Sequence, residues 1–290
     1  MKLYDSSLLV YVTVGVWTAR KLDKRATTQL THEASAVDSA ARVNKHLLAN
    51  ADAHLKAISA IAQRARRLLD ERTLPWDDAG NRICSNAGAM QLVADFDPIR
   101  REFHAAVDEF VAAYPDLREL AMTSLGDLAN ADDYPLPETL RGRFHLRLTL
   151  SPVADSFVSE VRKDVSTEQA SLLERHYQSR VEAQQSSALM AAWERLRADA
   201  ALLVDRLTTT SPTDRAKVRE AVVNNLVETS QILQGLNVFQ SAELDTVCRD
   251  VQNMLRGIDA QALREDTALS QKIRTEADDL VARLTGLLGA

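Results

Sequence analysis

The sequence predicts a mainly α-helical protein with long antiparallel coiled-coil-like helices, a C-terminal helical bundle and a small two-stranded β element. Three observations support this fold class. Apolar residues recur every three or four positions through most of the 290 residues, which is the period of a helix that buries one face. Only 5% of the residues are aromatic, so the core should consist mainly of Ala, Leu and Val. Finally, just two segments have the composition of strands.

These two segments are residues 8–17 and 143–150. The first (LLVYVTVGVW) is rich in β-branched and aromatic residues on both faces of the pleat, which is typical of a strand covered on both sides. The second alternates strictly: one face carries Phe144, Leu146, Leu148 and Leu150, and the other carries Arg143, His145, Arg147 and Thr149. Because a lone strand is not stable, we expect the two segments to pair despite their separation in sequence.

A long helix is predicted after the first strand. Residues 20–25 form a polar exit from that strand, and from there to about Thr31 the sequence shows no apolar period and is expected to form a loop. From Val37 to about Arg72, apolar and small residues are spaced alternately by four and three, which is the repeat of a coiled-coil seam. So narrow a stripe requires a partner helix, from the same chain or from a second copy. The seam residues are Val37, Ala41, Asn44, Leu48, Ala51, Leu55, Ile58, Ala62, Ala65 and Leu69.

Prolines punctuate the middle of the chain. Five of the seven lie within residues 75–137, and we expect the chain to turn there because proline fixes φ and removes a backbone donor. Asp97-Pro98 has the pattern of a helix start, and that helix should end at Tyr114-Pro115. A short helix over residues 116–128 is expected to follow.

The C-terminal half is predicted to form four further helices. Ser166 with Gln169 makes a capping box that would begin the first, which should run to about Thr208. The later helices are predicted to begin at Ser211-Pro212, at Ser241 and at about Ala260, the last of them reaching Leu288.

These elements divide the chain into two predicted domains. Residues 1–165 hold the strands, the long helix and the proline-rich region, and residues 166–290 hold the helical bundle. Charge is also unevenly divided. Residues 1–72 carry twelve Lys and Arg against seven Asp and Glu, a net +5, whereas the remainder carries 23 against 34, a net −11. A basic N-terminal region could contact nucleic acid or an acidic partner, or it could simply be a solvated helix surface.

A series of short motifs in roughly the first 160 residues carries a resemblance to a known family. The motifs are Trp17, Lys21-Leu22-Asp23, Asn44-Lys45, Thr73-Leu74-Pro75-Trp76 with Gly80 and Arg82, Tyr114-Pro115, Leu125-Gly126-Asp127-Leu128, Tyr134-Pro135-x-Pro137, Arg143-Phe144 and Ser151-Pro152-Val153. In this order they resemble a family of uncharacterised helical proteins that tailed phages and prophages encode, known only as a domain of unknown function. The chain departs from the family pattern at Asp155-Ser156-Phe157, where Asp-Phe is expected.

The resemblance implies an accessory role rather than a reaction. Members of the family often look to be encoded beside a MoxR-type AAA ATPase and a von Willebrand A-like protein, which implies a place in a chaperone-like machine in the cytoplasm of a bacterial host. The family has no known catalytic residues, so the resemblance assigns no site. The expected partner is such an ATPase or a second copy of the chain.

The sequence lacks the common motifs of enzymes and of cofactor sites. It contains no Gly-rich phosphate loop, no Gly-x-Ser-x-Gly elbow, no His-Glu-x-x-His and no calcium-binding loop. Cys84 and Cys248 are too few and too far apart for a disulfide framework or a zinc site. We therefore expect no catalytic residue, no metal and no cofactor, although carboxylates on neighbouring helices could be catalytic without any local motif.

Basic side chains form two candidate surfaces for an anionic partner. One lies near the end of the long helix, where the arginines could instead complement the helix dipole. The other lies on and beside the second strand, where they could instead pair with acidic residues of the long helices. The candidates are Arg64, Arg66, Arg67 and Arg72 on the helix, and Arg141, Arg143 and Arg147 at the strand.

Two aromatic residues are candidates for a contact with a partner or for anchoring a turn. Trp76 follows Pro75, and Tyr134 precedes Pro135, so each lies at an expected turn. A membrane role is not expected. The longest apolar run, residues 8–17, is about half the ~20 residues that a spanning helix needs.

Taken together, these features predict a non-enzymatic scaffold or adaptor protein of phage type that acts through coiled-coil contacts with another protein. The alternative is a nucleic-acid-binding accessory protein of phage replication or packaging. The basic N-terminal region favours that alternative, and the total charge of −6 disfavours it.

Overall fold

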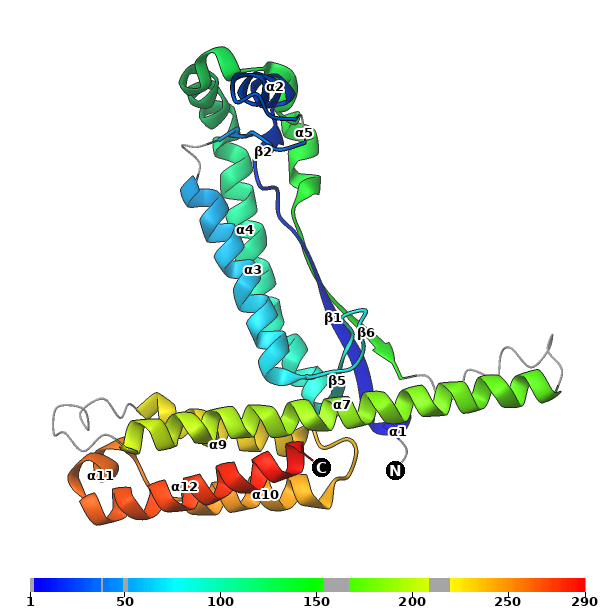
Figure 1. Cartoon of the computed structure of the whole chain (residues 1–290), viewed down its shortest axis with the longest axis vertical. Coiled ribbons are helices and arrows are strands. Elements are labelled where there is room, and N and C mark those ends of the chain that lie inside the picture. The colour runs from blue at the N-terminus through cyan, green and yellow to red at the C-terminus, as the bar shows by residue number, and fades with distance from the viewer. Residues whose placement is uncertain (1–2, 38, 49–51, 154–166, 209–219, 290) are drawn as a thin grey trace. The chain divides into compact units, whose positions relative to one another are not determined.

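A computed structural model describes residues 3–37, 39–48, 52–153, 167–208 and 220–289 (Figure 1). Over these residues the protein is mainly α-helical with a small antiparallel sheet, as predicted. By the contacts between its residues, the chain divides into two compact units. Unit 1 consists of residues 1–11, 69–92 and 150–290, and unit 2 of residues 12–68 and 93–149. The domain boundary predicted at residue 165 lies outside the described residues.

The helices and strands follow one another in this order along the chain. The helices are α1 (Leu3–Ser6), α2 (Lys24–Glu33), α3 (Asp52–Arg72), α4 (Asn86–Leu125), α5 (Pro137–Leu140), α7 (Thr167–Thr208), α9 (Glu220–Gly235), α10 (Ala242–Met254), α11 (Ala260–Glu265) and α12 (Thr267–Leu288). The strands are β1 (Ser7–Gly15), β2 (Arg20–Leu22), β3 (Asn44–His46), β4 (Leu74–Pro75), β5 (Arg82–Ser85) and β6 (His145–Pro152). Short 3₁₀ helices are η2 (Gly126–Leu128), η3 (Ala131–Asp133) and η4 (Arg141–Arg143). No helix in the described part of the chain is both long and apolar enough to cross a membrane.

The two predicted strands are neighbours in a sheet, but that sheet has four strands rather than two. Its order is β4-β5-β1-β6, so the expected pairing of β1 with β6 is present. The additional strands come from the proline-rich region. β5 pairs antiparallel with β1, with Leu8 opposite Cys84, and β4 pairs antiparallel with β5. Sequence patterns missed β4 and β5 because two- and four-residue strands are too short to show a period.

Residues 24–33 form a helix where a loop was expected. Asp23 is the N-cap of α2, and its side chain accepts a hydrogen bond from the amide of Ala26 at 3.0 Å. Within α2, Thr31 is the buried residue. A helix that buries so little shows no apolar stripe, and this explains why the period was absent.

The predicted long helix is shorter than expected at its N-terminal end. Residues 44–46 form β3, which pairs antiparallel with β2, and α3 begins at Asp52. The 3.5-residue spacing from Val37 to Leu48 therefore does not reflect a helix, and the predicted part of the seam before α3 was wrong. Ala51 lies outside the described residues. Within α3, the predicted seam positions Ile58, Ala62, Ala65 and Leu69 are buried, and Leu55 is half-buried.

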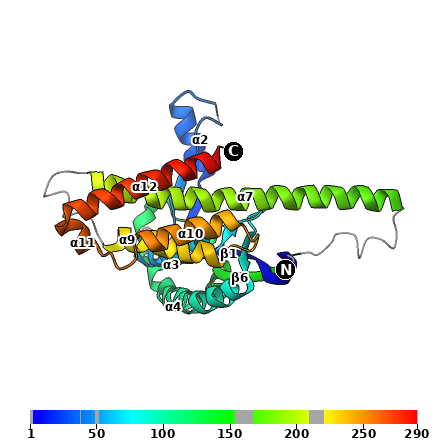
Figure 2. The ribbon, with the colours of Figure 1, turned by 90° about the horizontal axis from the view of Figure 1, so that it is seen from below.

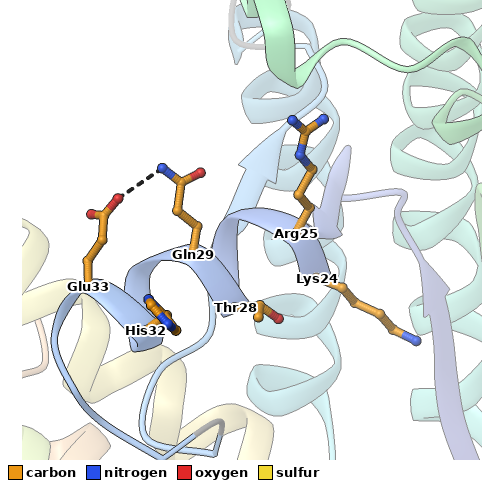
Figure 3. A pocket seen from close by; sticks show the side chains of 6 residues that line it. All are labelled: Lys24, Arg25, Thr28, Gln29, His32 and Glu33. Carbon is orange, nitrogen blue, oxygen red and sulfur yellow. Dashed lines mark hydrogen bonds between the residues drawn. The ribbon is translucent and has the colours of Figure 1, made fainter.

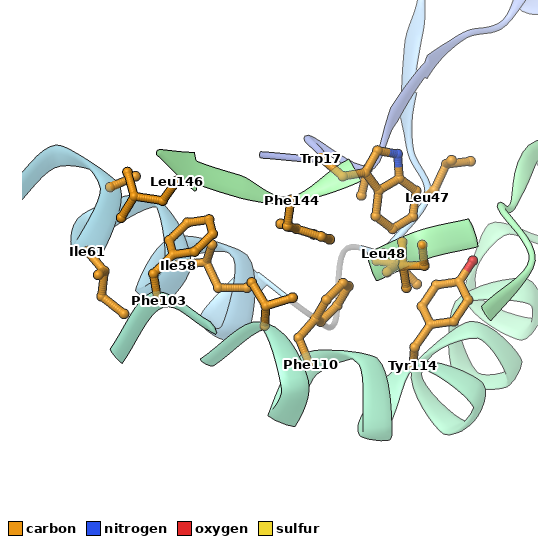
Figure 4. Close-up of a cluster of buried hydrophobic side chains, with 14 of the residues drawn as sticks. Trp17, Leu47, Leu48, Ile58, Ile61, Phe103, Phe110, Tyr114, Phe144 and Leu146 are labelled. Carbon is orange, nitrogen blue, oxygen red and sulfur yellow. The ribbon is translucent and has the colours of Figure 1, made fainter. Parts of the chain in front are cut away.

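The core of unit 2 packs α3 and α4 against β1 and β6 (Figure 4). Ile58 and Ala62 of α3 lie in the same buried cluster as Phe103 and Phe110 of α4. The ring centroids of Phe110 and Phe144 are 5.6 Å apart in an edge-to-face arrangement. Each large aromatic residue that is fully buried in such a cluster stabilises the fold by about 3 to 5 kcal/mol relative to Ala.

The helix α4 continues through both of its prolines, contrary to prediction. It begins at Asn86 rather than at Asp97, and it runs past Pro98 and Pro115 to Leu125. The predicted stop at Tyr114 and the separate helix over residues 116–128 are therefore wrong. Tyr114 is fully buried, and its hydroxyl donates to the main-chain oxygen of Pro135 at 2.9 Å. The packing of this turn of the helix offsets the loss of the backbone hydrogen bond that proline cannot donate.

The C-terminal helices of unit 1 pack side by side, with α7 against α9 and α12, and α9 against α10 (Figures 1 and 2). Ser241 caps α10 as predicted, because its hydroxyl accepts from the amide of Leu244 at 3.2 Å. The last predicted helix is instead two helices. Asp266 follows the end of α11 and is the N-cap of α12, where its side chain accepts hydrogen bonds from two main-chain amides. This cap divides the predicted single helix into two. The predicted starts at Ser166 and at Ser211-Pro212 lie outside the described residues.

Candidate functional site

The N-terminal half of α7 extends beyond the helices that pack against the rest of it. α7 has 42 residues, whereas α9 has 16 and α12 has 22. In both views α7 runs past the ends of α9, α10 and α12 (Figures 1 and 2). None of residues 168–187 is buried, whereas Ala188, Trp193 and Leu196 are. We refer to residues 168–187 as the uncovered half of α7.

The uncovered half carries one apolar stripe. Leu173, Tyr177 and Val181 are spaced by four residues, so they share a face, and each is half-buried. The neighbouring Leu172 is 62% exposed. The guanidinium of Arg180 lies 5.8 Å from the ring centroid of Tyr177. A narrow apolar stripe with charged neighbours is the kind of surface that another helix covers.

The outer face of α2 is a second exposed surface, in unit 2. A shallow hollow lies along this face and is lined by the side chains of a single helix, so it is open to solvent (Figure 3). Gln29 donates a hydrogen bond to the carboxylate of Glu33 at 2.9 Å. Two of the other lining residues are basic, which makes this face locally positive. The lining residues are Lys24, Arg25, Thr28, Gln29, His32 and Glu33.

A polar cavity of about 340 Å³ lies in unit 1, between the end of α3 and the helices α7 and α9. Arg195 of α7 donates from Nη1 to the main-chain oxygen of Glu71 at 2.7 Å and to that of Asp70 at 3.3 Å. Asp199, one turn further along α7, accepts from the hydroxyl of Thr229 at 2.6 Å. These bonds hold one cation and one carboxylate in place at the wall of the cavity.

A second arginine holds the same helix end. Arg82 donates from Nε to the hydroxyl of Thr73 at 2.6 Å and pairs with the carboxylate of Asp70 at 3.1 Å. Burial lowers the pKa of Arg82, and it also lowers that of Arg195, where the nearby Asp199 and Glu71 oppose the shift. Arginines are expected at this position because the C-terminal carbonyls of a helix carry partial negative charge.

A buried ion-pair network holds β2, β3 and η3 together in unit 2. The ammonium of Lys45 lies 2.5 Å from Oδ2 of Asp133 and 3.2 Å from Asp23, and it donates to the main-chain oxygen of Leu128 at 2.9 Å. Lys21 pairs with Oδ1 of Asp133 at 2.6 Å. The Lys45 ammonium thus has two carboxylates and one main-chain oxygen within 3.2 Å. The arrangement indicates a structural lysine rather than a nucleophile.

The pKa values within this network favour the charged forms. Burial alone would raise the pKa of Asp133, but hydrogen bonds from Lys21 and Lys45 outweigh it and hold the pKa below its ordinary value. The hydrogen bond to Asp133 raises the pKa of Lys45, although burial opposes it. The pKa of Asp23 is lowered, first by the hydrogen bond from the amide of Ala26 and then by Lys45.

The helix arginines proposed as anionic-partner contacts are in different environments. Arg64 forms a two-pronged pair with Glu102 of α4, with hydrogen bonds of 2.9 and 2.6 Å. Arg66 and Arg67 are exposed. Arg72 is half-buried and lines the polar cavity beside Arg195. The structure therefore leaves Arg66 and Arg67 on the surface and places the other two in contacts within the protein.

The strand arginines are also divided. Arg141 pairs with Asp108 of α4. Arg143 and Arg147 are exposed, whereas Phe144 between them is buried, so this segment has the two-faced pattern that was predicted. These two arginines remain candidates for contact with an anionic partner.

The two aromatic candidates are both buried in their own units. Trp76 is 6% exposed, and its main-chain amide donates to the main-chain oxygen of Asn81 across the turn. Tyr134 is also 6% exposed, and its hydroxyl donates to the main-chain oxygen of Leu47 at 2.8 Å. The guanidinium of Arg118 lies over the Tyr134 ring. Neither side chain is therefore exposed on the surface of its unit.

The described residues offer little of the chemistry that metal or thiol sites need. No group of three or more His, Cys, Asp or Glu side chains among them could hold a metal ion. Cys84 and Cys248 are fully buried, and burial raises the pKa of these thiols to about 11 and about 12. Both thiols are therefore protonated at neutral pH and unreactive while buried.

These candidate surfaces had weak signals in the sequence. The cavity draws residues from segments more than 120 positions apart, as in the bond from Arg195 to Glu71, which spans 124 positions. No local pattern could have assembled it. Several motif positions that carry the family resemblance do meet in the structure, since Lys21, Asp23 and Lys45 all belong to the ion-pair network. Their signal was the clustering of charged residues within otherwise unpatterned segments.

Comparison with known proteins adds nothing to this geometry. No protein family, no curated protein and no solved structure matches the chain.

Proposed function

We propose that the protein is a non-enzymatic helical adaptor that binds a partner protein through the uncovered half of α7. The observation that carries this proposal is the change of burial along one continuous helix. Residues 168–187 bury no side chain, and the part of α7 from Ala188 onward buries a regular stripe. An isolated helix of about twenty residues is marginal in water, because most helical stability in proteins comes from packing of an apolar face.

The other helical seams support this choice of surface. The seam of α3 is buried together with α4, and the C-terminal half of α7 is packed against α9 and α12. These seams need no second molecule. The stripe of Leu173, Tyr177 and Val181 does offer a surface of about two helical turns for a partner helix.

The partner that we propose is a MoxR-type AAA ATPase, with the adaptor acting as a phage-encoded accessory in the cytoplasm of the bacterial host. This choice follows from the resemblance of residues 1–160 to the phage family, whose members often look to be encoded beside such an ATPase. A coiled-coil contact between the stripe and a helix of the ATPase is the expected mode of binding. Self-association through the same stripe is the competing outcome.

Light scattering distinguishes these outcomes. We expect the chain to be monomeric alone and to form a stable complex with an ATPase encoded near its gene. The change Tyr177→Glu should weaken that complex at least tenfold, since a buried unpaired charge costs several kcal/mol. Ser179→Glu, at an exposed position on the opposite face of the same helix, is the matched control. A complex that survives Tyr177→Glu unchanged would contradict the proposed surface, and a concentration-dependent dimer would replace the ATPase by a second copy.

A nucleic-acid-binding role is the second candidate, and the face of α2 is the observation that favours it. Lys24 and Arg25 are exposed beside Thr28 and His32 on this face, with Glu33 as its one lining carboxylate. Lys and Arg that contact phosphates make binding fall steeply with salt. The double change Lys24→Glu and Arg25→Glu should abolish salt-sensitive retention of DNA or RNA. Absence of retention at low salt would end this candidate.

A further inference from the structure

The lining of the polar cavity in unit 1 is almost entirely polar. Of its eight lining residues, seven are polar or charged, and Ile232 is the apolar exception. A volume of about 340 Å³ is within the range of sites for small molecules. The lining comes from three helices, so the fold and not a local motif builds it. The polar members are Glu71, Arg72, Arg195, Asp199, Asn225, Glu228 and Thr229.

Two opposite charges at the wall are fixed in orientation. The two hydrogen bonds that hold Arg195 to the end of α3 both use Nη1. The bond from Thr229, whose side chain is buried, uses Oδ2 of Asp199. Among the described residues, Nη2 of Arg195 and Oδ1 of Asp199 therefore have no hydrogen-bond partner. A guanidinium edge and a carboxylate oxygen remain for a ligand, one helical turn apart on α7.

The signs of the surrounding charges restrict the ligand. A simple anion that approached Arg195 would meet the carboxylates of Glu71, Asp199 and Glu228 in the same space. A simple cation would meet the guanidinium groups of Arg195 and Arg72. A molecule with one carboxylate and one ammonium avoids both conflicts. Its carboxylate can pair with Arg195, and its ammonium can pair with Asp199 or Glu228.

We propose that this cavity binds a small zwitterion of the α-amino acid class. An α-amino acid separates its two charged groups by two bonds, which suits charges presented from one turn of a helix, and its side chain can contact Ile232. The proposal concerns a cavity in unit 1 and is independent of whether the uncovered half of α7 binds an ATPase. A bound amino acid would join α7, α9 and the end of α3, and so would stabilise unit 1.

Isothermal titration calorimetry on the full chain tests the proposal with the twenty α-amino acids as probes. Alanine, ethylamine and propionate form a matched set, since ethylamine lacks the carboxylate of alanine and propionate lacks its ammonium. At least one amino acid should bind, and removal of either charge from the probe should weaken binding at least tenfold. No heat from any amino acid at about 10 mM would overturn the proposal. Equal binding of ethylamine or propionate would overturn it as well.

Two variants locate the site. Glu228 is exposed, so Glu228→Gln should fold normally and weaken binding of the amino acid about threefold to tenfold. The matched control is Glu243→Gln, which changes an exposed carboxylate of α10 outside the cavity and should leave binding unchanged. Arg195→Lys keeps the charge but loses the planar fork, and it should reduce binding further, with thermal unfolding used to confirm the fold. Unchanged binding in both cavity variants would place the ligand elsewhere and overturn the proposal.

Discussion

The ammonium of Lys45 lies 2.5 Å from Oδ2 of Asp133, and the two side chains are 8% and 6% exposed. Eighty-eight positions separate them in sequence, so this contact joins β3 to η3 through tertiary structure alone. The same carboxylate accepts a second lysine, Lys21, whose side chain is 49% exposed. Asp133 thus pairs with one buried lysine, Lys45, and one exposed lysine, Lys21. The contributions of a buried and an exposed ion pair to stability can therefore be compared at a single site.

Removal of the carboxylate should be far more costly than removal of the exposed lysine. Asp133→Asn leaves the ammonium of Lys45 buried with only Asp23 as a charged partner, and we expect the free energy of unfolding to fall by about 3 kcal/mol. Lys21→Ala removes an exposed pair and should cost less than about 1 kcal/mol. Urea unfolding of the two variants and the wild type measures both values. Equal losses would show that the network is not effectively buried.

The same network makes stability depend on acid pH. The pKa of Asp133 is lower in the folded protein than in the unfolded chain, so the unfolded state binds the proton first as pH falls. The contribution of Asp133 is complete above its unfolded pKa of about 3.9, and it is lost as pH falls through the lower folded value. In Asp133→Asn this contribution is absent.

Urea unfolding between about pH 7 and about pH 3 measures this dependence. The wild type should lose stability more steeply than Asp133→Asn below about pH 4, so the difference between them should shrink. Lys21→Ala retains Asp133 and Lys45 and should follow the wild type more closely. Parallel curves for the wild type and Asp133→Asn would contradict the lowered pKa.

Sequence patterns correctly predicted the elements that depend mainly on neighbouring residues, such as an alternating strand or a capped helix start. The alternation around Phe144 correctly indicated a half-buried strand, although β6 begins at His145 and Leu150, predicted on its buried face, is exposed. Ser241 correctly marked the start of α10. The start at Asp97-Pro98 failed although its capping pattern was good, because α4 had already begun at Asn86 and packing of its face maintained the helix through proline. A local capping pattern shows that a helix can begin at a position, but tertiary packing determines whether a helix does begin there.

The surfaces with functional interest could not be predicted for a related reason. The stripe of Leu173, Tyr177 and Val181 looks like the buried stripe further along α7, since both repeat at helical spacing. What distinguishes them is the length of α9 and α12, which end before they reach the first stripe. The polar cavity likewise requires Glu71, Arg195 and Thr229 to meet, and no short segment contains more than one of these positions.

A close contact between β1 and β6 makes Gly15 sensitive to substitution. A Cβ atom on Gly15 would overlap the imidazole ring of His145. The ring or the strands must therefore shift in Gly15→Ala, and we expect a loss of about 1 to 3 kcal/mol in the free energy of unfolding. The double variant Gly15→Ala with His145→Ser should recover most of this loss, because the ring that causes the overlap is gone. Additive losses in the double-mutant cycle would show that the cost arises elsewhere.

The two cysteines should respond to thiol reagents only when unit 1 unfolds. Cys84 and Cys248 are fully buried, and their raised pKa values leave very little thiolate near pH 8. We expect labelling by a chromogenic disulfide reagent to be slow in buffer and complete in urea, where an exposed cysteine has a pKa of about 8.5. Each single variant, Cys84→Ala or Cys248→Ala, leaves one cysteine, so that the thiols of β5 and α10 can be followed one at a time. A thiol that reacts rapidly in the folded protein would reveal local opening of the element that contains it. Two thiols that become accessible at the same urea concentration would instead indicate that the sheet and the C-terminal helices of unit 1 unfold together.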